Sequence, residues 1–270
     1  MAAPWRPDPS KGVFETLLVL DGRPVELEAH LSRLDESLSK VFPTLRRPRI
    51  ALEAPLEGDA VRIDVAPRGA RLEARVSMRE IEHHGRGSLC SLRLAGGLGP
   101  HKWADRSLLN EAQAALPDDA LPLIVDEDGT ALEASRANVF AVRDGVLVTP
   151  PLDGRILPGV TRMRVLRIAE ALGIESREEP LSRDDLLAAD EAFLTGSLRG
   201  VEPAGSLDGH PVPGGGPIAE RLAAELRRAW TGLGTAASFG DRLARPHAAA
   251  GLRTRQDGKT AQQSCADLYP

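Results

Sequence analysis

The stretch GVFETLLVLDGRPVELEAHLSRL, residues 12–34, decides the fold, because it places a strand, a tight turn and a helix in immediate succession. Residues 12–20 predict a strand, Asp21-Gly22 a hairpin turn, and residues 24–27 the returning strand. From Glu28 to Val41, apolar residues recur at helical spacing with polar residues between them. The stretch therefore predicts a hairpin that leads directly into an amphipathic helix.

The remaining chain continues this mixture of hairpins and helices. Strands are expected at 60–66 and 71–78 around the turn Pro67-Arg68-Gly69, and at 89–94, 121–125, 138–142 and 191–195; helices are expected at 104–115, 161–172 and 217–230. Hairpins mixed with helices indicate an α+β chain in two unequal lobes, and not a doubly wound parallel sheet.

Composition suggests where the lobes begin and end. We expect an N-terminal α/β lobe in residues 1–82 and a linker at 83–87, within the polar run EHHGRG. A C-terminal lobe then occupies residues 88–234. Residues 235–270 lose all periodicity and predict a disordered tail.

Charge and residue usage exclude several classes of protein. The net charge of −5 gives no basic excess for binding nucleic acid, and no apolar run approaches the roughly 20 residues that span a bilayer. Two cysteines, Cys90 and Cys265, are too few for a disulfide framework, so we expect a cytoplasmic protein. His83, His84 and His101 lack the spacing of metal ligands, so no metal site is expected.

Four segments together resemble the class IV aminotransferase family, which contains branched-chain and D-amino-acid aminotransferases and aminodeoxychorismate lyases. They are residues 12–34, LGPHKWADRSLL (98–109), EASRANVFAV (133–142) with TPPLDGRILPGVTR (149–162), and DEAFLTGSLRGVEPA (190–204). The resemblance implies a two-lobed pyridoxal-phosphate enzyme of fold type IV, whose larger lobe has a mixed or antiparallel, barrel-like β core. It also implies a homodimer with its active sites near the interface.

Lys102 is the residue that the resemblance matches to the lysine that binds the cofactor covalently. Covalent chemistry with a carbonyl group needs an amine, and the chain has only four lysines. Lys102 lies between a predicted strand and a predicted helix, whereas Lys11 and Lys259 lie in terminal segments and Lys40 ends a surface helix. Without the resemblance, Lys102 would be interpreted as a solvated surface lysine.

The resemblance assigns further residues to the cofactor. Glu133 is expected to hold a proton on the pyridine nitrogen, although a carboxylate after a hairpin is also typical of a solvated turn. Arg33, the helix start at Gly159-Val160-Thr161, and Ser197 match the phosphate anchors. Asn138 is expected to fix the local backbone rather than to contact substrate.

The substrate side of the site favours a lyase. Phe14 stands where D-amino-acid aminotransferases have a tyrosine, and HKWADR has the Lys-x-x-(Asn/Asp)-Arg pattern of the lyases. Arg68, in a shortened loop, is a weak candidate for contact with substrate. We therefore expect release of pyruvate and 4-aminobenzoate from 4-amino-4-deoxychorismate, as in folate biosynthesis.

Two alternatives remain. One is an aminotransferase for a D-amino acid, a branched-chain amino acid or another amine. The other is a homologue that binds pyridoxal phosphate without turning substrate over, against which the intact set of Lys102, Glu133 and Arg33 argues.

Overall fold

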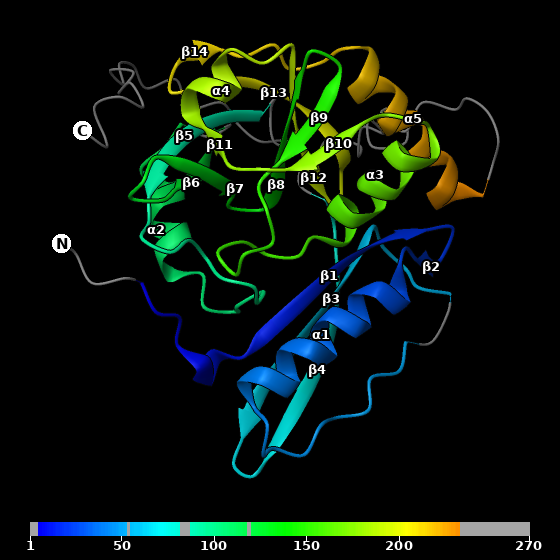
Figure 1. The fold of residues 1–270 in the computed structure, drawn as a ribbon. Coiled ribbons are helices and arrows are strands. Elements are labelled where there is room, and N and C mark those ends of the chain that lie inside the picture. The colour runs from blue at the N-terminus through cyan, green and yellow to red at the C-terminus, as the bar shows by residue number, and fades with distance from the viewer. Residues whose placement is uncertain (1–4, 53–54, 82–86, 118–119, 233–270) are drawn as a thin grey trace, which may run out of the picture.

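The computed structural model describes residues 5–52, 55–81, 87–117 and 120–232, which form two β-sheet lobes (Figure 1). The N-terminal lobe contains a short 3₁₀ helix, η1 (Pro9–Lys11), the strands β1 (Val13–Leu20), β2 (Arg23–Pro24), β3 (Ala60–Arg68) and β4 (Arg71–Arg79), and the helix α1 (Leu27–Val41). The strands pair antiparallel in the order β2-β1-β3-β4. Helix α1 covers one face of this sheet, where Leu34 and Leu38 pack with Leu17 and Ile63 in one apolar core.

The C-terminal lobe is built on a closed barrel of six strands. Around the barrel these are β8 (Ala137–Arg143), β12 (Glu191–Gly196), β13 (Gly200–Leu207), β5 (Gly87–Arg93), β6 (Ala120–Val125) and β7 (Thr130–Ala134). Pairing of β7 with β8 closes the ring, with Glu133 opposite Asn138 and Ala134 opposite Ala137. Strand β5 runs parallel to β6 and β13, and the other pairs in the barrel are antiparallel.

Further strands and the helices surround the barrel. They are β9 (Val146–Thr149), β10 (Ser176–Glu178), β11 (Leu181–Ser182), β14 (His210–Pro211), α2 (Ser107–Ala114), α3 (Val160–Ala171), α4 (Arg183–Leu187) and α5 (Pro217–Thr231). Phe140 of β8 and Phe193 of β12 stack with their ring centroids 5.2 Å apart, and pack with apolar residues of α3 and α5. None of the helices in these ranges is long and apolar enough to cross a membrane.

The α+β, two-lobed architecture confirms the fold expected from the sequence, although several of its elements differ from those expected. Helix α2 begins at Ser107 and not at 104, because the Asp105 carboxylate binds Lys11, the Asp8 amide and Ser107, which holds the preceding residues outside the helix. Strand β13 was not predicted, since GVEPAGSL contains glycine and proline and has low strand propensity.

The predicted linker and tail lie largely outside the described residues. The linker at 83–87 falls outside the described residues except for Gly87, which is the first residue of β5. The tail at 235–270 also falls outside them, so both remain predictions.

Candidate active site

A cavity of about 540 Å³ is lined by residues of both lobes. Its walls come from β1, β3 and α1 on one side, and from the barrel strands β7, β8 and β12 with the beginning of α3 on the other. Of the residues predicted from the sequence, the cavity brings together Lys102, Glu133, Arg33, Gly159, Val160, Thr161, Ser197 and Phe14. A volume of this size is typical of a small-molecule site.

Arg68 is the one candidate that the structure does not bring to this cavity. It is exposed at the end of β3, at the tip of the β3–β4 hairpin, and it is not among the lining residues. Arg62, earlier on the same strand, lines the cavity instead, with its guanidinium carbon 3.8 Å from the centre of the Phe14 ring. A contact between Arg68 and a substrate in this cavity is therefore not supported by the position of the hairpin.

Lys102 lies in the loop between β5 and α2, as its sequence context predicts. The backbone around it is tied to β1, because the Phe14 amide donates to the Lys102 carbonyl at 2.9 Å and Val13 forms a bridge with Trp103. The side-chain amine lies 4.9 Å from the Phe14 ring centre and has no hydrogen-bond or ion-pair partner in the described part of the chain. Burial, together with the positive charge of Arg33, lowers the pKa of this amine to about 7.

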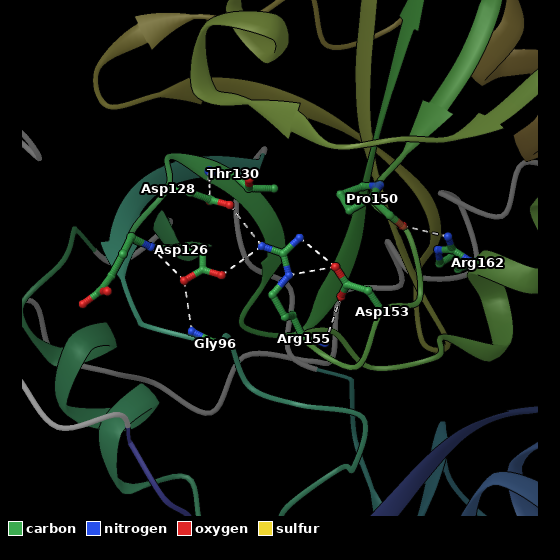
Figure 2. A network of polar contacts seen from close by, with 9 residues as sticks. Gly96, Asp126, Asp128, Thr130, Pro150, Asp153, Arg155 and Arg162 are labelled. Atoms are coloured by element: carbon green, nitrogen blue, oxygen red, sulfur yellow. Dashed lines mark hydrogen bonds and ion pairs between the residues drawn. The ribbon is translucent and has the colours of Figure 1, made fainter.

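The glycine-rich loop before Lys102 is fixed by a close backbone approach. Gly97 has a φ of +67°, and a Cβ there would lie 2.3 Å from the Arg155 carbonyl oxygen, so only glycine fits. The Gly99 amide donates to the same carbonyl at 3.1 Å. Figure 2 shows the Arg155 guanidinium held by Asp126 and Asp153, at 2.9 and 2.7 Å. The network thereby ties the loop before Lys102 to the loop before α3.

Glu133 is buried in β7, so the interpretation as a solvated turn residue is wrong. One carboxylate oxygen accepts the Leu157 amide at 3.1 Å, and the other accepts the Asn138 side-chain amide at 3.4 Å. Burial raises the pKa of Glu133 to about 8, against the opposing effects of the Leu157 hydrogen bond and the Lys102 charge. Asn138 also donates to the Leu157 carbonyl at 3.0 Å, in agreement with the predicted backbone role.

The N-terminus of α3 opens into the cavity without a side-chain cap. Gly159 is the N-cap residue, and its backbone dihedral angles are ones that any residue can adopt. A Cβ there would nevertheless lie 2.0 Å from Oδ1 of Asn138, so lack of space makes this position a glycine. The first N–H groups of a helix have no acceptor within the helix and favour an anion. Thr161 and Ser197 line the same cavity, and the buried Thr195 hydroxyl has no hydrogen-bond partner among the described residues.

Arg33 reaches this helix start from α1 and is buried, which excludes the solvated-face interpretation of its side chain. Its Nη1 donates to the Pro158 carbonyl at 2.9 Å, and Nε and Nη2 donate to the two oxygens of Glu15 at 2.8 and 2.7 Å. His30 contacts the same carboxylate at 2.8 Å. Three of the five guanidinium N–H groups are thus used, and two remain for an anion.

Sequence reasoning missed Glu15, His30 and Thr195, which lie in or behind this cavity, and gave Arg106 no role beyond its place in the pattern HKWADR. Glu15 and His30 are each only 1% exposed. Burial alone would raise the pKa of Glu15, but the charge of Arg33 and hydrogen bonds from His30 and Arg33 lower it to about 2. A signal was present, since Glu15 is a carboxylate within the apolar strand VFETLLVL. Thr195 had no comparable signal.

The comparisons with known proteins agree with this fold. A family model described as Amino-transferase class IV matches residues 106–207. The branched-chain-amino-acid aminotransferase of Escherichia coli (strain K12) is 40% identical over 112 residues, which are 41% of this chain and 36% of the relative. The chain thus aligns with little more than a third of that curated relative's length.

Two longer matches extend the likeness to most of the chain. The D-alanine aminotransferase of Bacillus licheniformis is 24% identical over 245 residues, covering 80% of this chain and 86% of the relative. The crystal structure of 4-amino-4-deoxychorismate lyase from Pseudomonas aeruginosa is 27% identical, with a TM-score of 0.67, covering 81% of this chain and 90% of that one.

Proposed function

We propose that the chain is a pyridoxal-phosphate enzyme of the class IV aminotransferase family in which Lys102 binds the cofactor; the match of residues 106–207 to the family model and the likeness to the Pseudomonas aeruginosa lyase support this. The observation that carries the proposal is the amine of Lys102, which has a pKa of about 7 and faces a cavity that also holds Glu133 and the uncapped start of α3. An amine that is half neutral at neutral pH is a ready nucleophile for an aldehyde.

The residues present fit the chemical parts of pyridoxal phosphate. The uncapped amides of α3, the two remaining N–H groups of Arg33 and the unpartnered hydroxyl of Thr195 supply donors for a phosphate. The carboxyl group of Glu133 is suited to a ring nitrogen that shares a proton with it. The cofactor, when bound, supplies an aldehyde and an electron-withdrawing ring.

The chain's own residues then have distinct tasks. Nζ of Lys102 would hold the cofactor covalently and, when free, would accept or deliver a proton at the substrate. A pKa of about 7 allows Nζ to do both near neutral pH. Glu133 holds a proton at the ring nitrogen, and Leu157 and Asn138 keep its oxygens in place.

We propose 4-amino-4-deoxychorismate as the first candidate substrate, with pyruvate and 4-aminobenzoate as products. Phe14 is 6% exposed at the cavity wall, next to Lys102 and Arg62, and provides an apolar surface for a ring-shaped substrate. The Lys-x-x-Asp-Arg pattern of residues 102–106 and the likeness to the Pseudomonas aeruginosa lyase support the same reaction.

Amino-group transfer is the second candidate, and the 40% identity to the Escherichia coli branched-chain-amino-acid aminotransferase favours it. Both reactions need the same amine at Lys102, so the residues around Lys102 do not separate them. They differ in the co-substrate, because transfer consumes a 2-oxo acid and the lyase reaction does not.

The test is to assay purified protein loaded with pyridoxal phosphate against 4-amino-4-deoxychorismate without a 2-oxo acid, measuring 4-aminobenzoate and pyruvate. Equal amounts of both products, lost in Lys102→Ala, are expected. Rapid exchange between D-alanine or leucine and a 2-oxo acid, with no 4-aminobenzoate formed, would assign the chain to the aminotransferases instead.

A further inference from the structure

Arg106, at the beginning of α2, is a cation in the cavity that no role described so far uses. It lines the cavity four residues after Lys102, together with Arg62 and Arg136. Burial, then the positive charge of Arg136 and that of Arg62, lower the pKa of Arg106 to about 10, against the opposing charge of Glu133. The guanidinium therefore remains charged at neutral pH, in surroundings with an excess of positive charge.

Three other arginines at the cavity wall have partners of opposite charge. Arg33 pairs with Glu15, Arg62 with Asp64 and Arg199 with Glu202, each at 2.7 Å. Arg106 differs from these, because no carboxylate lies within ion-pair distance of it among the described residues. A half-buried guanidinium without a counter-ion is costly for a protein to maintain.

The orientation of Arg106 is nevertheless fixed. Its Nη2 donates to the Ser135 carbonyl at 2.7 Å, in the tight connection between β7 and β8. One of five N–H groups is used in this way, and four remain to bind an anion in the fork geometry that suits a carboxylate. An oriented cation without a counter-ion is what a site for an anionic ligand requires.

The position of this cation relative to Lys102 indicates which anion it binds. Arg106 is close enough to lower the pKa of both Lys102 and Glu133 through its charge. Arg62 and the Lys102 amine contact the same Phe14 ring, at 3.8 and 4.9 Å. Arg33, by contrast, is bound to Glu15 and to the Pro158 carbonyl at the start of α3. The cavity thus has a second cationic region, near the reacting amine and built from different elements.

We propose that Arg106, assisted by Arg62, is the binding site for a carboxylate of the substrate. This inference rests on the proposed pyridoxal-phosphate function and adds to it the side chains that bind the carboxylate of the substrate. An amine without a carboxylate would leave the charge of Arg106 without a counter-ion. The enzyme should therefore discriminate against such a substrate.

The test uses benzoate and its neutral analogue benzamide as non-reacting probes, titrated calorimetrically into protein loaded with pyridoxal phosphate. The parent should bind benzoate at least about tenfold more tightly than benzamide. Arg106→Met should weaken benzoate on the order of 10- to 100-fold while leaving benzamide and pyridoxal phosphate within about threefold. Arg143→Met is the matched control, because Arg143 pairs with Asp185 outside the cavity, and it should change neither probe.

Several results would overturn the inference. Equal binding of benzoate and benzamide by the parent would do so without any variant, and so would unchanged benzoate binding by Arg106→Met. A loss of affinity for pyridoxal phosphate as large as the loss for benzoate would make Arg106 a phosphate ligand instead. If Arg106→Met does not fold, Arg106→Lys replaces it, with an expected loss of about three- to tenfold because lysine lacks the planar fork.

A failure of the proposed function can be distinguished from a failure of this inference. Loading with pyridoxal phosphate is measured first, from visible absorbance. Protein that fails to load refutes the proposed function, and titration of the unloaded parent and Arg106→Met then still tests the carboxylate site.

Discussion

The capture of pyridoxal phosphate by Lys102 should depend on pH with a midpoint near 7. Attack on the aldehyde needs the neutral amine, and burial with the charge of Arg33 lowers the pKa of this amine to about 7. At pH 7 about half of the amine is then neutral, whereas an ordinary lysine with a pKa near 10.4 would be neutral to less than about one part in a thousand. The structure therefore predicts a rate advantage on the order of 10³ over a solvated lysine at that pH.

The sign of the pH effect follows from the lowered pKa. Below pH 7 the amine is protonated and the second-order rate of capture should fall about tenfold per pH unit; above pH 7 it should level off. The assay is stopped-flow absorbance after mixing protein stripped of cofactor with pyridoxal phosphate between pH 5.5 and 9.5. Pyridoxal, which lacks the phosphate, is the control for ionisation of that group and should give the same midpoint.

A rate that continues to rise tenfold per pH unit between pH 8 and 9.5 would refute this reasoning. It would show that the amine keeps the pKa of an exposed lysine, and that the cavity around Phe14 does not bury it. A midpoint shared by both aldehydes near pH 7 would support the position assigned to Lys102.

Three substitutions test the other parts of the site. Glu133→Gln should keep the cofactor bound but lower turnover about 10²- to 10³-fold, or about 2–4 kcal/mol, because a neutral amide cannot hold the ring proton. Steady-state activity within about threefold of the parent would remove Glu133 from the site. Arg33→Ala should weaken the binding of pyridoxal phosphate by about 1.5–3 kcal/mol, as measured by equilibrium titration, and should affect the rate of the cofactor-saturated enzyme less than it affects binding. An unchanged Kd would contradict the anchoring role. Gly159→Ala should weaken cofactor binding and lower the free energy of unfolding by about 1–3 kcal/mol, because its Cβ would lie 2.0 Å from Oδ1 of Asn138. Thermal unfolding identical to that of the parent would show that Asn138 moves aside.

The sequence contained enough to predict the parts of the site that lie in continuous motifs. Lys102 stands at a strand–loop–helix junction, and the start of α3 follows a Leu-Pro-Gly loop, so local patterns place both. The paired strands β1, β3 and β4 have regular alternation or turn signals, and the structure has them where they were expected.

Features that depend on distant contacts were not predictable in the same way. Closure of the barrel needs β13, whose glycines and proline give no strand signal. The partnership of Glu15 with Arg33 and His30 joins a strand to a helix, and no local rule pairs these residues. For Arg68 the sequence suggested a contact with substrate that the structure does not show. Arg68 lies at the tip of the β3–β4 hairpin and is not among the residues that line the cavity.

The most direct test of the central claim is to identify the residue that binds the cofactor. Protein purified with pyridoxal phosphate is reduced with borohydride, digested and mapped by mass spectrometry, with Lys102→Ala as the control. We predict a single reduced pyridoxyl adduct, on Lys102, and none in the variant. An adduct on Lys11 or Lys40, or no adduct on a protein that binds pyridoxal phosphate, would contradict the account.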